Sequence, residues 1–70
     1  MKKQEFLEFS KDKKIYSEDE AIKKFYENKY RTYRENVEPI YFEQTAYHDN
    51  SYYYDKNRNI IIEHSYYVGD

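Results

Sequence analysis

At residues 39–47 the chain reads PIYFEQTAY, and here the spacing of apolar residues changes from a helical to a strand pattern. Pro39 prevents a helix from continuing, because the residue before a proline is forced toward extended backbone. Beyond Pro39, apolar and polar side chains alternate, which predicts a strand from Ile40 to Tyr47. A chain that is helical before this point and extended after it belongs to the α+β class.

Upstream of Pro39, Ser17 and Glu20 form a capping-box pattern, which marks the start of a helix. Apolar residues then recur every three or four positions and predict one stripe on a helix from Glu18 to about Asn36. The stripe consists of Ala21, Ile22, Phe25, Tyr26, Lys29, Tyr30 and Tyr33.

Downstream of residue 47, turn residues and short apolar runs follow one another. His48–Ser51 has turn composition, Tyr52–Tyr54 is a predicted short strand, and Asp55–Asn59 is a second turn. Ile60–Val68 alternates again and predicts a third strand. These segments predict a three-stranded antiparallel sheet.

Residues 3–13 are compatible with a short amphipathic helix or with an edge strand. Long charged side chains dominate and no β-branched residue precedes Ile15, which favours the helix. We therefore predict a single small domain over residues 1–70, with one or two N-terminal helices on one face of the sheet. The element order is ααβββ, or βαβββ if the first segment is a strand.

Tyrosine dominates the composition: the chain has 70 residues, of which 11 are tyrosine, and it contains neither cysteine nor tryptophan. So high an aromatic content argues against disorder, although 37% of the residues are charged. The absence of cysteine excludes disulfides and thiolate metal sites. No signal peptide or membrane span is evident, so we expect a cytoplasmic protein with no membrane association.

Residues that could support catalysis are few. No cysteine nucleophile exists, and the single glycine, Gly69, rules out a glycine-flanked serine or a phosphate-binding loop. His48 and His64 could act as bases, but no adjoining nucleophile completes a catalytic unit. They also share no recognised metal-ligand spacing. We therefore predict a protein that is not an enzyme and has no metal or cofactor.

The strand pattern sends several tyrosines to the side of the sheet that the helices leave uncovered. Residues 39–70 also hold two basic against five acidic residues, so this region is acidic. Tyrosine is enriched in protein interfaces and often supplies most of the binding energy. An acidic, aromatic face thus predicts a partner-binding surface, with cross-strand stabilisation or a face-to-face homodimer as alternatives. The predicted residues are Tyr41, Glu43, Tyr47, Asp49, Tyr53, Asp55, Glu63 and Tyr67.

The helix offers a second hypothesis, single-stranded nucleic-acid binding. Aromatic side chains beside basic groups hold single strands without sequence preference. The net charge of -2 argues against this function, since nucleic-acid binders are usually basic. The residues concerned are Lys23, Tyr26, Lys29, Tyr30, Arg31, Tyr33 and Arg34.

Lys, Asn, Ile, Tyr and Phe together make up half the chain. In this composition, and in its size and lack of catalytic residues, the chain resembles small early proteins of phages and mobile elements in AT-rich bacteria. The resemblance implies a protein that binds and inhibits a larger host protein, in the manner of anti-CRISPR proteins that act on defence nucleases or on other nucleic-acid-processing proteins.

Overall fold

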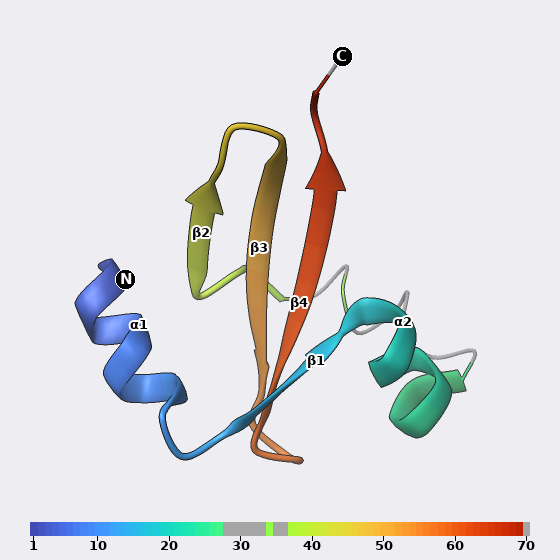
Figure 1. The fold of residues 1–70 in the computed structure, drawn as a ribbon. Coiled ribbons are helices and arrows are strands. Elements are labelled where there is room, and N and C mark those ends of the chain that lie inside the picture. Colours follow the sequence, from blue (N-terminus) through green and yellow to red (C-terminus); the bar gives the residue numbers. More distant parts are fainter. Residues whose placement is uncertain (28–33, 35–36, 70) are drawn as a thin grey trace.

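The structure is a computed structural model that describes residues 1–27, 34 and 37–69. It confirms the α+β class, with the segments in the order α β α β β β (Figure 1). The helical segments are α1 (Lys3–Ser10), α2 (Glu18–Ala21) and the π-helical turn η1 (Ile22–Tyr26). The strands form one sheet in the order β1-β4-β3-β2. They are β1 (Lys14–Ser17), β2 (Tyr41–Gln44), β3 (His48–Asp55) and β4 (Ile60–Tyr67).

Strands β2, β3 and β4 form the expected antiparallel meander, but the first turn lies earlier than predicted. The predicted turn His48–Ser51 is the first half of β3 instead. The Thr45 amide donates to the His48 carbonyl over 2.8 Å, and the Thr45 hydroxyl accepts from the His48 amide over 3.0 Å. A threonine side chain therefore closes this turn, and no glycine, proline or asparagine marks it.

Strand β1 was not predicted, and it makes the sheet mixed instead of purely antiparallel. It runs parallel to the first half of β4, with Ile15 opposite Ile61 and Ser17 opposite Glu63. A four-residue strand carries almost no periodic signal of its own. It forms because β4 offers an edge of buried isoleucines on which Tyr16 can pack.

The helical segments cover both faces of the sheet, so the prediction that they share one face is wrong. α1 packs Phe6 against Tyr52 and Ile61. On the opposite face, Ala21 and Tyr26 from α2 and η1 belong to a cluster with Tyr16, Tyr53, Ile60 and Ile62. Both faces of β4 are apolar over Ile60–Ile62, and each therefore needs a cover.

Helix propensity gave the correct structure for the N-terminal segment, and the strand alternative is wrong. α1 ends at Ser10, because a turn follows in which the Lys13 amide donates to the Ser10 carbonyl. The predicted cap of the next helix is confirmed, since the Ser17 hydroxyl accepts from the Glu20 amide over 3.3 Å. The predicted continuous helix Glu18–Asn36 is wrong, because α2 and η1 end at Tyr26 and Glu27 leaves helical geometry with a φ of 49°. Residues 28–33, 35 and 36 of that prediction lie outside the described residues.

Candidate protein-binding surface

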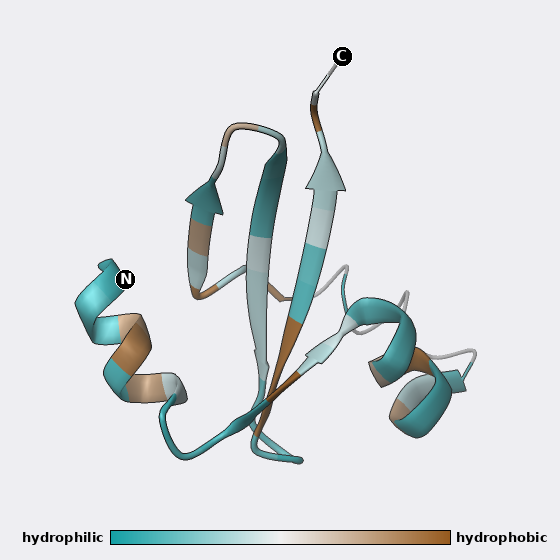
Figure 2. Ribbon diagram, in the orientation of Figure 1, coloured by the Kyte–Doolittle hydropathy of each residue, from teal (hydrophilic) through white to brown (hydrophobic). Residues whose placement is uncertain are grey.

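One end of the sheet extends beyond the helices. We call it the distal end; it comprises β2 from Phe42 on, the turn at residues 45–47, the start of β3 and the second half of β4 (Figure 1). Burial decreases steadily toward it: Ile60–Ile62 are buried, Glu63 and His64 are half-buried, and Ser65–Tyr67 are exposed. In Figure 2, β4 changes from hydrophobic residues at its start to hydrophilic residues in its middle and residues of intermediate hydropathy at its end. The described helical segments thus cover only the proximal half of the sheet.

Large apolar side chains nevertheless gather at the distal end. Tyr66 lies on the Ile62 face of β4 and Tyr67 on the Ile61 face, so the apolar groups surround the end of the sheet from both sides. About half or more of each side chain is exposed, from 46% for Val68 to 63% for Tyr47. We call this set the aromatic tip: Phe42, Tyr47, Tyr66, Tyr67 and Val68.

Backbone and ring contacts hold the tip in a defined shape. The Val68 amide donates to the Tyr47 carbonyl over 2.9 Å, which fastens the turn to the end of β4. The Tyr67 ring meets His48 edge to face, with ring centroids 5.4 Å apart. A Cβ at Gly69 would lie 2.8 Å from the Tyr67 hydroxyl and 3.1 Å from the Tyr47 ring, so both rings close over this glycine. Tyr47 and Tyr67 would therefore lose little side-chain entropy on binding.

The charges near the tip are acidic. In residues 39–70 the basic side chains are Lys56 and Arg58, and both lie in the β3–β4 turn at the opposite end of the sheet. Glu43 and Asp49 lie on the distal side. Lys3 reaches Glu43 from α1 over 3.8 Å and offsets part of its charge, although such an exposed ion pair contributes little to stability.

The structure does not bring the eight predicted partner-binding residues together on one face. Four of them lie on the Ile61 face: Tyr41, Glu43, Glu63 and Tyr67. Asp49, Tyr53 and Asp55 lie on the Ile62 face, and Tyr47 is in the turn. The sequence pattern correctly predicted which residues of one strand share a face. It did not predict the register between strands, which decides which residues of different strands share a face. Tyr47 and Tyr67 are the pair that the fold places together in the open.

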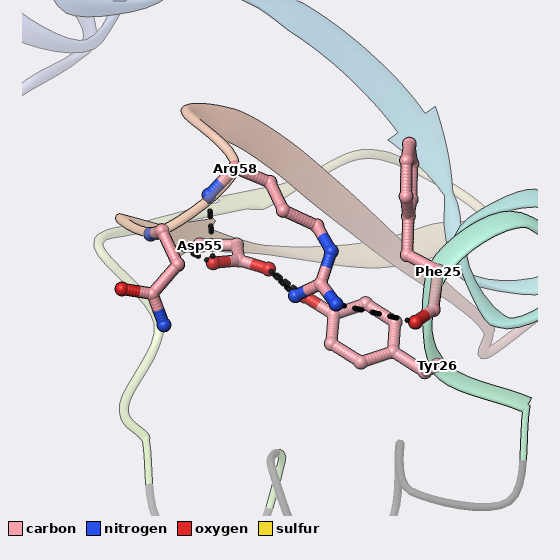
Figure 3. A network of polar contacts seen from close by, with 5 residues as sticks. Phe25, Tyr26, Asp55 and Arg58 are labelled. Atoms are coloured by element: carbon pink, nitrogen blue, oxygen red, sulfur yellow. Dashed lines mark hydrogen bonds and ion pairs between the residues drawn. The ribbon is translucent and has the colours of Figure 1, made fainter.

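Tyr53 and Asp55 are buried, which corrects their expected exposure. Asp55 is 2% exposed and accepts hydrogen bonds from the Tyr26 hydroxyl and, over 2.9 Å, from Arg58 (Figure 3). Its other oxygen accepts from the amides of Asn57 and Arg58. Burial disfavours the carboxylate, but these bonds and the arginine charge outweigh it, and the pKa of Asp55 is lowered. Asp55 therefore joins η1 to the β3–β4 turn.

A second buried network lies beneath α1. The Tyr52 hydroxyl donates to Glu63 over 2.7 Å, and Phe6 stacks on Tyr41 with ring centroids 4.5 Å apart. Burial raises the pKa of Tyr52, and the hydrogen bond to Glu63 raises it further. Tyr41 and Glu63 thus stabilise the packing of α1 on the sheet, Tyr41 by stacking on Phe6 and Glu63 by accepting from Tyr52.

The residues of the nucleic-acid hypothesis are only partly described. Tyr26 is buried on Asp55, and Arg34 lies over the Tyr53 ring and donates to Glu18. Lys23 is exposed. The remaining predicted residues, Lys29, Tyr30, Arg31 and Tyr33, lie outside the described residues. Two of the three described side chains therefore serve packing, which weakens this hypothesis.

His48 and His64 lie on adjacent strands but on opposite faces. His48 begins β3, contrary to its assignment to a turn, and His64 is the expected half-buried strand residue. His64 lies 3.4 Å from Arg34 and 3.9 Å from Glu18. Within residues 1–27, 34 and 37–69, no cluster of three or more histidine or carboxylate side chains could hold a metal ion.

The sequence interpretation missed three members of the tip, Phe42, Tyr66 and Val68, because it assigned their face to the core. Comparisons with protein-family models, with curated proteins and with solved structures find no match to this chain. In the part of the chain that the structure describes, no helix is long and apolar enough to cross a membrane.

Proposed function

We propose that this chain is a non-enzymatic protein-binding module whose contact surface is the aromatic tip. The observation that carries the proposal is the exposure of five large apolar side chains at one end of a sheet whose other end is covered by helices. Tyrosine-rich patches of this kind supply the central contacts of protein interfaces. The tip thus replaces the flat sheet face as the proposed site.

The acidic surroundings favour a partner with a basic surface. Asp49 lies opposite Tyr66 on one face, and Glu43 lies on the other. Carboxylates beside aromatic rings suit lysine and arginine side chains, which gain both ion pairing and cation–π contacts. Nucleic-acid-processing proteins carry basic surfaces. The proposal therefore agrees with the resemblance in composition to phage and mobile-element proteins that inhibit larger host proteins.

A capture experiment with paired variants tests the proposal. The tagged chain is incubated with extract of its native host, and retained proteins are identified by mass spectrometry. Tyr47→Ala combined with Tyr67→Ala should lose the captured partner while keeping the circular dichroism spectrum. Leu7→Ala is the control, because Leu7 is 56% exposed but lies on α1, away from the tip.

Retention of the same partner by the double variant, at unchanged affinity, would show that the tip is not the site. Sedimentation of the free protein separates a further case. A dimer that dissociates in the double variant would make the tip a contact between two copies and would also contradict the proposal. The affinity of the captured partner should fall only modestly with added salt, whereas a nucleic-acid complex would weaken steeply.

A further inference from the structure

Lysines gather at the proximal end of the sheet, opposite the tip. This end comprises the turn at residues 11–13, the start of β1 and the β3–β4 turn (Figure 1). Lys14 of β1 lies opposite Ile60 of β4, so the two turns are neighbours. η1 is tied to the same place, because the Arg58 guanidinium donates to the Phe25 carbonyl over 3.3 Å. Three segments that are far apart in the chain thus bring their lysines to one end of the molecule.

Two carboxylates at this end are already neutralised. Asp12 forms an ion pair with Lys13 over 3.1 Å. Asp55 is buried and forms an ion pair with Arg58 over 2.9 Å. Each of these carboxylates therefore takes up one basic side chain, and neither is left to balance a further lysine.

Exposed lysines remain beyond these pairs, and among the residues that the structure describes they form no ion pair. The exposed carboxylates on either side of η1, Glu20 and Glu27, form no ion pair with them either. The proximal end therefore carries an excess of positive charge, although the net charge of the chain is -2. We call this set the proximal lysines: Lys11, Lys14, Lys24 and Lys56.

Two of the proximal lysines lie against one aromatic ring. The Lys14 ammonium lies 4.9 Å from the centroid of the Tyr16 ring, and the Lys24 ammonium lies 5.5 Å from it. Both charges are thus held beside the same side chain, although like charges repel each other. Within the described residues, no carboxylate pairs with either of them. An anion between the two ammonium groups would offset their repulsion, so this pair favours an anionic ligand.

The surroundings of the proximal lysines favour nucleic acid over a protein or a membrane. Protein interfaces have an apolar centre and are poor in lysine. Membrane-surface segments insert several large apolar side chains. In β1 and the two turns, the large apolar side chain that is exposed is Ile15, at 43%. Contacts to a phosphate backbone need no apolar centre, because lysine and arginine side chains supply them.

The rings near these lysines favour a duplex over a single strand. Proteins that hold single strands without sequence preference stack the bases on exposed aromatic rings. Here Tyr16 is buried, and Phe25 and Tyr54 are half-buried. A duplex keeps its bases stacked on one another and presents its phosphates on the outside, so it needs no such rings.

We infer that the proximal lysines bind the phosphate backbone of double-stranded nucleic acid without reading its sequence. The inference goes beyond the proposed function, because this site lies at the opposite end of the sheet from the aromatic tip and takes a different partner. It uses none of the residues of the helix hypothesis and requires no stacking of bases. The two ends of the molecule can therefore hold a protein and a duplex at the same time.

Fluorescence anisotropy of a labelled DNA duplex tests the inference with the purified full chain. Each phosphate contact contributes about -0.9 to the slope of log K against log salt concentration. Four lysines therefore predict a slope of up to about -3.6. Duplexes of unrelated sequence should bind equally within about 2-fold, since phosphate contacts carry no sequence information. An RNA duplex presents the same phosphates, and binding of either duplex supports the inference.

Two double variants divide the site. Lys14→Gln combined with Lys24→Gln should weaken duplex binding at low salt by at least about 5-fold and reduce the slope to about -1.8. Lys11→Gln combined with Lys56→Gln should have the same effect. The second pair has no ring contact to lose, so it keeps the test decisive if the first pair lowers stability. Circular dichroism checks that each variant is folded.

Lys2→Gln combined with Lys3→Gln is the matched control. It changes the net charge by the same amount, but Lys2 caps α1 and Lys3 reaches Glu43 on the distal side. This variant should bind the duplex within about 2-fold of the parent, because charges beyond a Debye length are largely screened.

Absence of duplex binding at low salt would overturn the inference, and so would equal weakening by the control variant. Tighter binding of a single strand, of vesicles that contain anionic lipid or of polyglutamate would also overturn it, because duplex phosphates would then not be the preferred ligand. The test uses no host partner, so its failure leaves the proposed function untouched. The Tyr47/Tyr67 variant should bind the duplex as the parent does, and loss of the duplex from that variant would refute a site at the proximal end.

Discussion

Replacing Tyr26 by phenylalanine should destabilise the fold far more than the loss of one hydroxyl group suggests. The Tyr26 hydroxyl donates a hydrogen bond to the Asp55 carboxylate, which is 2% exposed. The same carboxylate forms an ion pair with the Arg58 guanidinium over 2.9 Å. Because water cannot replace the lost donor at this depth, Asp55 would keep its charge with one partner fewer. A hydrogen bond to a charged group contributes about 1.5–3 kcal/mol to stability.

That loss is large for a chain of this size. A 70-residue domain has a free energy of unfolding of about 3.5–10 kcal/mol. A loss of about 2 kcal/mol corresponds to a decrease in Tm of roughly 8–16 °C for a domain of this length. Urea unfolding monitored by circular dichroism measures the free energy directly, and a thermal scan gives the Tm.

Tyr54→Phe is the matched control, because its hydroxyl bonds to Asn59 at the exposed surface. It should cost less than about 0.5–1 kcal/mol, since water can replace that partner. An equal effect of the two substitutions would refute the reasoning. So would a Tyr26→Phe variant that unfolds within about 0.5 kcal/mol of the parent, because Asp55 would then not depend on the tyrosine.

Three further predictions concern pH and packing. The pKa of Asp55 is lowered in the folded protein, so its contribution to stability is present above its unfolded pKa of about 4 and is lost as pH falls below that value. In urea unfolding measured at a series of pH values, Asp55→Asn should therefore reduce the loss of stability at acidic pH. The pKa of Tyr52 is raised, so stability should fall as pH rises above about 10, and Tyr52→Phe should remove that decrease. Phe6→Ala should lower the free energy of unfolding in urea by about 3–5 kcal/mol, because Phe6 is 5% exposed and packs against the rings of Tyr41 and Tyr52. A cost as small as that of the exposed Leu7→Ala would contradict this prediction.

The backbone of the β3–β4 turn offers a last test. Asn59 has a φ of 54°, a left-handed conformation that asparagine and glycine tolerate better than other residues. Asn59→Ala should cost about 1–2 kcal/mol, and Asn59→Gly should cost less despite losing the same bond to Tyr54. Equal costs for the two variants would place the whole effect in that hydrogen bond.

The sequence by itself determined the local elements of this protein. Ser17 marked the start of α2, the alternation from Ile60 onward predicted β4, and the turn composition of Asp55–Asn59 located the second hairpin. Each of these signals acts over a few neighbouring residues. The hydrogen bonds or side-chain alternation responsible lie within the segment itself, and a sequence pattern can therefore reveal them.

Tertiary structure alone decided how these elements combine. Alternation shows which residues of a strand share a face, but not which face a helix will cover, and so Tyr53 and Asp55 were expected outside and are buried. Strand β1 depends on pairing with Ile60–Glu63, more than forty residues away in the chain. Because β1 stops at Ser17, no strand among the described residues pairs with the last residues of β4 on the β1 side, and that edge of the sheet stays open there. The exposure of the aromatic tip and of that edge depends on how much of the sheet the helical segments and β1 cover. No local sequence pattern specifies this extent.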